Sequence, residues 1–130
     1  MAFQLLFDAR YRVVLVRPGP DLTPAVLGDM RDAVGRFVAA NGACRGIMDF
    51  TPVERIDLPS TTVVEYGRKA PALGEHKRVF VAPTDALFGL CRMFGAYRDR
   101  QGFAPEIVRS LPEAYAALGL SGPEFAPVGG

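Results

Sequence analysis

Hydrophobic positions near the N-terminus fall in two short, partly alternating runs. Phe3 to Phe7 and Tyr11 to Val16 are separated by the turn-like Asp8-Ala9-Arg10. Short apolar runs rich in β-branched residues and joined by a turn are typical of a β-hairpin. Arg17-Pro18-Gly19-Pro20 ends the second run, because prolines lack the donors that a central strand needs. The pattern therefore predicts an N-terminal hairpin.

The next stretch has the spacing of a helix. Thr23-Pro24 supplies an N-cap followed by proline at the first helical position. Asn41-Gly42 supplies a stop. Between them, apolar residues recur every three or four positions, which predicts one amphipathic helix of about five turns: Val26, Leu27, Met30, Ala33, Val34, Phe37 and Val38.

Short apolar segments then alternate with helical patterns as far as residue 120. Strands are predicted at residues 46–50, 78–82 and 106–109, with a further extended piece at 53–56. Helices are predicted from Ser60 to about residue 70, from Thr84-Asp85 to about residue 100, and from the capping box at Ser110 to Leu118. The order β-β-α-β-α-β-α-β-α predicts a single α/β domain whose mostly parallel sheet contains one antiparallel strand.

Domain organisation and composition limit the classes of function. Residues 1–120 form the predicted domain, and residues 121–130, with two prolines and three glycines, are predicted to be a flexible tail. Fifteen basic and fourteen acidic residues leave a net charge of +1, which is not the electrostatic footprint of a nucleic-acid binder. Apolar runs fall short of the ~20 residues that span a bilayer. Met1-Ala2-Phe3-Gln4 begins no signal peptide, so we expect a cytoplasmic protein.

Candidate catalytic groups are scattered. His76 stands in a charged loop, where a solvated role is expected, and Ser60, Ser110 and Ser121 lie in no G-x-S-x-G context. The glycines fit no phosphate-binding loop. We therefore expect no enzyme activity, no cofactor and no metal. Cys44 and Cys91 lie among apolar neighbours and are predicted to be buried, reduced thiols.

Two carboxylates follow apolar, strand-like segments. Asp49 and Asp57 would lie at the C-terminal ends of strands, where ligands gather in parallel sheets. Such a pair suits Mg²⁺ binding or acid–base chemistry. The alternative, which we favour, is structural: Asp49 would accept hydrogen bonds from loop amides, and Asp57 would cap the turn into the helix that begins at Ser60.

The third predicted helix has an unusually wide apolar arc. One face carries Leu87, Leu90, Cys91, Phe94 and Tyr97, and the flanks add further apolar side chains. The excess suggests a second contact, with a dimer mate, a protein partner or an apolar ligand. The alternative is that the neighbouring helix and the tail cover the flanks. The predicted association or ligand surface, most simply of a homodimer, comprises Phe88, Arg92, Met93 and Tyr97.

These features resemble a known family. The hairpin, the long helix and a buried strand followed by Ile56-Asp57-Leu58-Pro59-Ser60 and a helix resemble a STAS domain, the fold of anti-sigma-factor antagonists and of sulfate-transporter C-terminal domains. The SpoIIAA-like branch is the more similar, since its members resemble Val81-Ala82-Pro83 followed by Phe88 to Phe94 and Tyr97-Arg98. The resemblance extends over about residues 3 to 120.

The resemblance implies a non-enzymatic regulatory module that binds a kinase-like protein. Such antagonists are switched by phosphorylation of a serine in an Asp-Ser-Ser-Gly segment at a helix start. Asp57 matches the acid, but Leu58 and Pro59 replace the two serines and Ser60 stands at the glycine position, so the standard switch is not expected. Ser60, Thr61 and Thr62 are predicted to cap the helix, or alternatively to form a switch or partner site where a phosphate would be favoured.

Two functions of different class are thus carried forward. The first is a protein-interaction or signalling module that uses the helix start from Asp57 to Thr62 and the apolar third helix. The second is a binder or sensor of a small apolar or lipid-like ligand held beside Phe88, Met93 and Tyr97. The hypothesis that we favour least is an enzyme that uses Asp49, Asp57 and His76.

Overall fold

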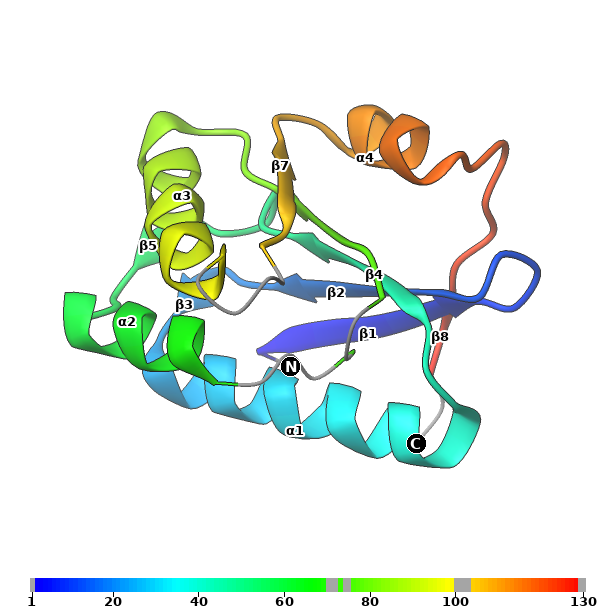
Figure 1. Cartoon of the computed structure of the whole chain (residues 1–130), viewed down its shortest axis with the longest axis horizontal. Helices are drawn as coiled ribbons and strands as arrows, with labels where there is room; N and C mark the ends of the chain where they lie inside the picture. Colours follow the sequence, from blue (N-terminus) through cyan, green and yellow to red (C-terminus); the bar gives the residue numbers. More distant parts are fainter. Residues whose placement is uncertain (1, 70–72, 74–75, 100–103, 129–130) are drawn as a thin grey trace.

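The structure, a computed structural model, describes residues 2–69, 73, 76–99 and 104–128 (Figure 1). Strands and helices alternate through most of the chain, in the order predicted from the sequence. In chain order, the elements are β1 (Phe3–Asp8), β2 (Val13–Pro18), β3 (Asp21–Leu22), α1 (Pro24–Asn41), β4 (Arg45–Asp49), β5 (Arg55–Ile56), α2 (Ser60–Arg68), β6 (Arg78–Val81), α3 (Asp85–Asp99), β7 (Glu106–Val108), α4 (Leu111–Leu118) and β8 (Ala126–Pro127).

The main sheet has the strand order β7-β6-β4-β2-β1-β8. Strands β2, β4, β6 and β7 run parallel, and β1 pairs with β2 in the antiparallel sense expected of the hairpin. Each of β4, β6 and β7 is reached from the preceding parallel strand of this sheet through one helix, as β–α–β crossovers require. The predicted α/β class, with a mostly parallel sheet and four helices in the described residues, is confirmed.

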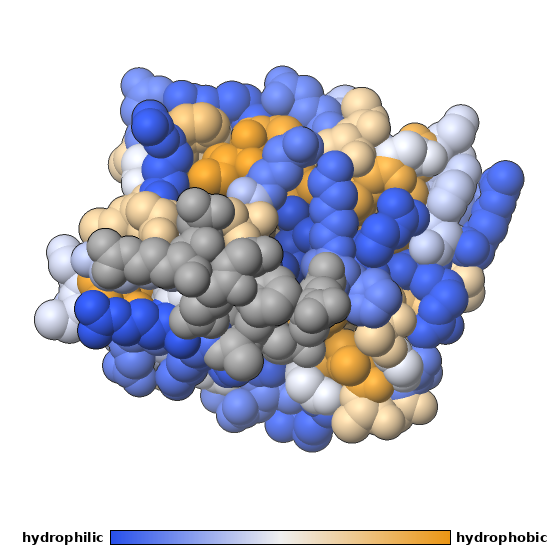
Figure 2. Space-filling model, viewed as in Figure 1, coloured by the Kyte–Doolittle hydropathy of each residue, from blue (hydrophilic) through white to orange (hydrophobic). Residues whose placement is uncertain are grey.

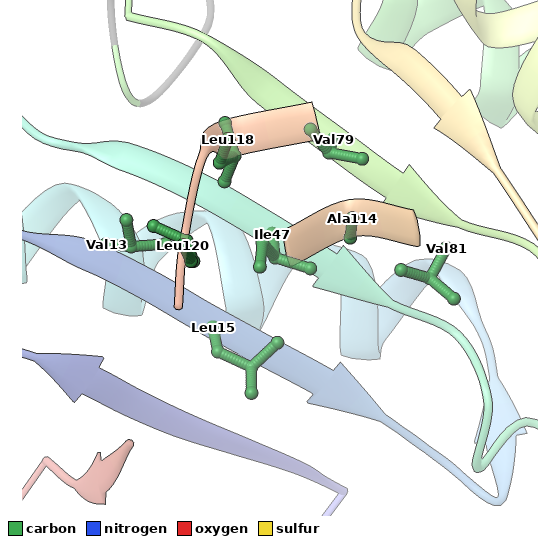
Figure 3. Close-up of a cluster of buried hydrophobic side chains, with 8 residues drawn as sticks. All are labelled: Val13, Leu15, Ile47, Val79, Val81, Ala114, Leu118 and Leu120. Atoms are coloured by element: carbon green, nitrogen blue, oxygen red, sulfur yellow. The ribbon is translucent and has the colours of Figure 1, made fainter. Parts of the chain in front are cut away.

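Helices cover the two faces of the sheet unequally. Helices α1, α2 and α3 lie over the face of the sheet that carries Val14, Val16 and Phe80. Of the helices in the described residues, α4 is the one that covers the opposite face, on the other side of the sheet from α1 (Figure 1). Figure 3 shows the cluster under α4, in which strand side chains point toward the helix: Val13, Leu15, Ile47, Val79, Val81, Ala114, Leu118 and Leu120.

Helix starts follow the sequence signals at three of the four helices described. The Thr23 hydroxyl accepts a hydrogen bond from the Val26 amide at 3.2 Å, and Thr84 does the same for Leu87 at 3.2 Å. Ser110 caps α4, where its hydroxyl accepts a bond from the Glu113 amide at 3.4 Å. Within the described ranges, no helix is both long enough and apolar enough to cross a bilayer.

The C-terminal segment differs from the flexible tail that the sequence predicted. Ala126–Pro127 forms β8, which pairs antiparallel with β1, and the Val128 amide donates to the Leu5 carbonyl at 2.9 Å. The Glu124 amide donates to the Asp8 carboxylate at 2.6 Å. By pairing with β1, this segment covers backbone groups that would otherwise be exposed at the edge of the sheet. β8 is now the edge strand, a position where proline is tolerated. Residues 129–130 lie outside the described residues.

A second, two-stranded sheet holds the segment that leads into α2. Strand β3, which the sequence analysis did not predict, pairs parallel with β5. Arg55 Nε lies 2.8 Å from Asp21 Oδ1, and the Asp57 amide donates to the Leu22 carbonyl at 2.8 Å. The segment before α2 is therefore hydrogen-bonded to the segment before α1, and the two-stranded sheet positions the starts of both helices.

Candidate functional site

An exposed surface surrounds the start of α2. Ile56 is 38% exposed, which makes it one of the few large hydrophobic residues at the surface of the described chain. The residues that follow it are mostly exposed, while Leu58 and Thr62 are half-buried. The exposed members, called the α2 surface below, are Ile56, Asp57, Pro59, Ser60 and Thr61. The structure thus brings three predicted switch residues, Asp57, Ser60 and Thr61, to one exposed place.

The expected cap at this helix start is wrong. Ser60 is the first helical residue, and the cap position belongs to Pro59, whose φ is −59° and ψ 145°. Proline has no side-chain oxygen, so the cap makes no side-chain hydrogen bond, and the Thr62 amide donates to the Pro59 carbonyl at 2.9 Å instead. The Asp57 carboxylate is exposed and does not supply the cap. The first amides of α2 keep their partial positive charge without a capping oxygen.

Hydroxyl and aliphatic groups continue along the outer face of α2. A shallow depression there is lined by Ser60, Thr61, Val64, Glu65 and Arg68. Glu65 pairs with Lys69 one turn later at 3.5 Å. The face therefore combines small polar groups, an aliphatic side chain and both signs of charge, which is the mixed character of a protein-contact surface.

Asp49 and Asp57 lie in different environments. Asp49 is 1% exposed, with Oδ2 3.1 Å from Arg17 Nε, although the two groups are not aligned for a good hydrogen bond. Its Oδ1 accepts a bond from the Thr51 amide at 3.0 Å, as the structural alternative predicted. Burial raises the pKa of Tyr115, the Asp49 carboxylate raises it further, and Arg17 opposes the shift. Asp49 is thus a buried, paired group in the core under α4.

The other candidate catalytic groups are dispersed. His76 is exposed, Ser110 caps α4, and Ser121 is exposed with its amide bonded to the Tyr11 hydroxyl at 3.2 Å. Within the described ranges, His, Cys, Asp and Glu form no group of three suited to a metal ion. Among the described residues, Ser110 and Ser121 thus take structural roles and His76 stands at the surface.

Both cysteines are buried and free, as predicted. Burial raises the pKa of Cys91 to about 12 and raises that of Cys44. The thiolate is the reactive form of cysteine, so neither position suits nucleophilic chemistry near neutral pH.

Two aromatic rings of the predicted α3 surface are used within the chain. The Arg109 guanidinium lies over the Phe88 ring at 4.0 Å and also pairs with Asp85 at 3.0 Å. Tyr97 packs closely on α2, because a Cβ placed on Gly67 would lie only 2.7 Å from Tyr97 Cβ. Figure 2 shows that hydrophobic areas on the viewed face are separated by hydrophilic ones.

The remaining members of that surface are Met93, which is half-buried, and Arg92, which is exposed. The neighbouring residues Ala86, Gly89 and Ala96 on the outer side of α3 are exposed but small. Packing inside the fold thus takes up much of the apolar arc that suggested a second contact. Association through α3 stays a prediction.

A cavity of about 150 Å³ lies beneath the three-helix face. Natural cores contain few voids larger than a water molecule. The space is therefore larger than an ordinary packing gap, and it is partly open to the surface. Its lining is largely apolar and comes from β2, β4, β6, three helices and connecting loops. The spacing of apolar residues predicts which side chains face the core. It carries no signal for whether those side chains fill the space between the helices and the sheet.

The cavity is lined by residues of α3 other than those of the predicted ligand surface. Leu90, Cys91 and Phe94 line it from α3, whereas Phe88, Met93 and Tyr97 do not. The inward side of α2 contributes Val63 and Tyr66. The helix that carries the exposed α2 surface therefore also forms one wall of the cavity.

The strand order and the distribution of the helices over the two faces define a mixed α/β fold that is consistent with that of STAS domains. A solved structure with this architecture is that of the anti-sigma factor antagonist SpoIIAA in its unphosphorylated form. It matches with a TM-score of 0.54 and 18% sequence identity, over 89% of this chain and 96% of that one. No protein-family model matches the sequence, and no curated protein does. The resemblance inferred from sequence is confirmed as a similarity of fold.

Proposed function

We propose that this protein is a non-enzymatic regulatory module that binds a protein partner through the α2 surface. The observation that carries the proposal is Ile56, a large hydrophobic side chain exposed beside a helix start that has exposed hydroxyls and no side-chain cap. Exposed apolar patches rimmed by polar groups mark interaction sites, and we propose that Ile56 forms such a patch with the exposed Pro59. Asp57, Ser60 and Thr61 provide that rim.

The α2 surface is held by contacts that limit its motion. Both the Glu54 and Arg55 amides donate to the Pro20 carbonyl, at 2.7 Å and 3.1 Å. The ion pair between Arg55 and Asp21 adds a side-chain contact between β5 and β3. A preorganised surface loses less conformational entropy on binding, so the arrangement favours recognition of a partner.

The fold shared with SpoIIAA supports a partner of regulatory type. That protein is an anti-sigma factor antagonist whose structure was solved unphosphorylated. The partner we propose is accordingly a kinase-like regulator, met in the cytoplasm. Ser60 and Thr61 present exposed hydroxyls at the helix start, where a phosphate would be favoured. However, Leu58 and Pro59 occupy the two positions at which the antagonists of the resembled family have their serines. We propose binding without the standard phosphoserine switch.

Two matched variants test the proposal. Ile56 and Val128 are both exposed large hydrophobic residues, at 38% and 36%, but Val128 follows β8 rather than lying near α2. The tagged wild type and Val128→Asp should capture the same protein from a lysate of the source cells, and Ile56→Asp should lose it. Thermal unfolding of the three proteins checks that they are folded. Equal capture by Ile56→Asp and wild type would place the partner surface elsewhere.

Homodimerisation through α3 is the alternative association that we carry forward. Sedimentation of the wild type beside a Phe88→Asp, Met93→Asp double variant tests it. A wild type that is monomeric at high concentration excludes the homodimer, and equal dimerisation of both proteins places the contact outside α3.

A second candidate function is the binding of a small apolar ligand. The cavity beneath the three-helix face favours it, because its lining is largely apolar and its volume of about 150 Å³ exceeds that of a packing gap. The two functions are compatible, since α2 carries the α2 surface on its outer side and lines the cavity with its inner side.

A further inference from the structure

We propose that the cavity binds a compact, neutral aromatic molecule about the size of benzene. The proposal rests on the second candidate function and names the chemistry of its ligand. An enclosed cavity of about 150 Å³ lined by leucine, isoleucine and phenylalanine side chains binds benzene in a known engineered case. The cavity described here has that volume and a largely apolar lining, but it is partly open to the surface.

Aromatic side chains form one side of the cavity. Phe50 and Phe80 meet edge to face with their ring centroids 5.9 Å apart, and Phe80 stacks with Phe94 at 5.3 Å. All three rings line the cavity. Aromatic pairs favour edge-to-face and offset-stacked contacts beyond the area that they bury, so a further ring in the cavity can extend the cluster.

Sulfur atoms lie in the same lining. Met30, Met48 and Cys91 line the cavity together with the three phenylalanine rings. Thioether sulfur makes favourable contacts with aromatic rings, and flexible methionine side chains adapt to irregular shapes. The Cys91 thiol is buried. The lining therefore offers a ring these directional contacts in addition to the dispersion contacts that a straight hydrocarbon chain would also make.

Polar side chains also reach the cavity, but they do not require a charged ligand. Arg31, Tyr66 and Arg78 are among the lining residues, and each takes part in an interaction within the chain. A charged ligand would have to compete with those interactions and lose its own hydration in a largely apolar space. The apolar lining thus favours a neutral ring.

The position of α2 explains how the space is kept open. Gly67 lets α2 pack closely on α3, since a Cβ there would lie 2.7 Å from Tyr97 Cβ and 3.2 Å from the Phe94 carbonyl oxygen. The helix thus packs on its neighbour, and Val63 and Tyr66 face a space that they do not fill. The walls come from several elements, so the cavity is a property of the folded domain as a whole.

Fluorobenzene is the probe, because its ¹⁹F signal reports binding directly. The test titrates it into the full chain and follows the ¹⁹F shift together with the rise in Tm. Val63→Phe places a ring in the cavity, and Val64→Phe adds the same ring at the next residue, which lines the depression on the outer face of α2. Wild type and Val64→Phe should bind saturably with equal dissociation constants. Val63→Phe should bind about tenfold more weakly or not at all.

Milder variants keep the test valid if Val63→Phe does not fold. Val34→Ile adds one carbon to a lining residue of α1, and Val38→Ile adds one carbon to the same helix at a residue that does not line the cavity. Only Val34→Ile should weaken fluorobenzene binding. The absence of saturable binding by wild type would overturn the proposal, and so would equal binding by both members of either pair.

The same variants separate this inference from the protein-binding proposal. Ile56→Asp should bind fluorobenzene as wild type does, because Ile56 does not line the cavity. Failure of partner capture by the wild type would leave the ¹⁹F result unchanged. Failure of fluorobenzene binding would likewise leave the result with Ile56→Asp unchanged.

Discussion

The two faces of the sheet are filled in different ways. One short helix, α4, lies directly on the strands and closes a cluster of fully buried side chains. Three helices lie over the opposite face and leave a cavity of about 150 Å³. The number of helices over a face does not decide how well it is packed, and the placing of small residues explains the difference.

Each face has a small residue at its closest helix contact. Ala114, fully buried in α4, faces the strands and lets that helix approach the sheet. Gly67 in α2 faces α3, so the close approach occurs between two helices. The close contact at Ala114 is thus between a helix and the sheet, whereas the close contact at Gly67 is between two helices.

Truncation of leucines on the two faces should give the largest contrast. Leu118→Ala in α4 removes a buried side chain from the closed cluster and should lower the free energy of unfolding by about 3 kcal/mol. Leu90→Ala in α3 should cost about 1 kcal/mol, because Leu90 is half-buried and already borders empty space. Urea unfolding of both variants measures the difference. Equal losses would show that the cavity is filled in solution.

Acidification should lower the folding stability that Asp8 contributes where the C-terminal segment is attached. The Tyr11 amide donates to Asp8 Oδ1 at 2.8 Å, and this bond, more than that from Glu124, holds the pKa of Asp8 below its ordinary value of 3.8 despite burial. A lowered folded-state pKa contributes stability above the ordinary pKa that is lost as the pH falls through the folded value. Wild type should therefore exceed Asp8→Asn in Tm at neutral pH.

The difference between wild type and Asp8→Asn should shrink as the pH falls below 3.8. Thermal unfolding of both proteins across the acid range measures it. If the difference in Tm between wild type and Asp8→Asn does not change with pH, the ionised carboxylate contributes no more to stability than the hydrogen bonds that asparagine can also accept.

Serine substitutions at two helix starts should give the smallest contrast. Ser110→Ala removes the cap of α4 and should cost about 1 kcal/mol, which lowers Tm by a few degrees. Ser60→Ala should leave Tm nearly unchanged, because Ser60 is the first helical residue rather than the cap. Differential scanning calorimetry distinguishes the two. A fall in Tm for Ser60→Ala as large as that for Ser110→Ala would restore the capping role.

Local patterns in the chain determined most of the elements. The hairpin, the long α1 and the capping box at Ser110 depend on residues close in sequence, so periodicity and cap chemistry predicted them. Strands β3 and β8 were missed, because two-residue strands have no period and form only where a distant partner, β5 or β1, leaves backbone groups to pair.

Positions of the candidate residues depended on tertiary structure to different degrees. Asp57, Ser60 and Thr61 lie together because they are neighbours in sequence, and the resemblance to STAS domains pointed to them. The burial of Asp49 against Arg17 brings together residues from two strands. The covering of Phe88 by Arg109 likewise needed the packing of the chain before it could be seen.

The sequence by itself determined the α/β class, the order of the elements and which side chains are apolar, since these follow from local spacing and burial preference. Only the tertiary structure decided that Gly67 packs α2 on α3, that Pro59 replaces Ser60 as the cap, and that a cavity remains among apolar residues. The physical reason is that a void is a property of surfaces that fail to meet. No single segment carries that information, because each wall comes from a different part of the chain.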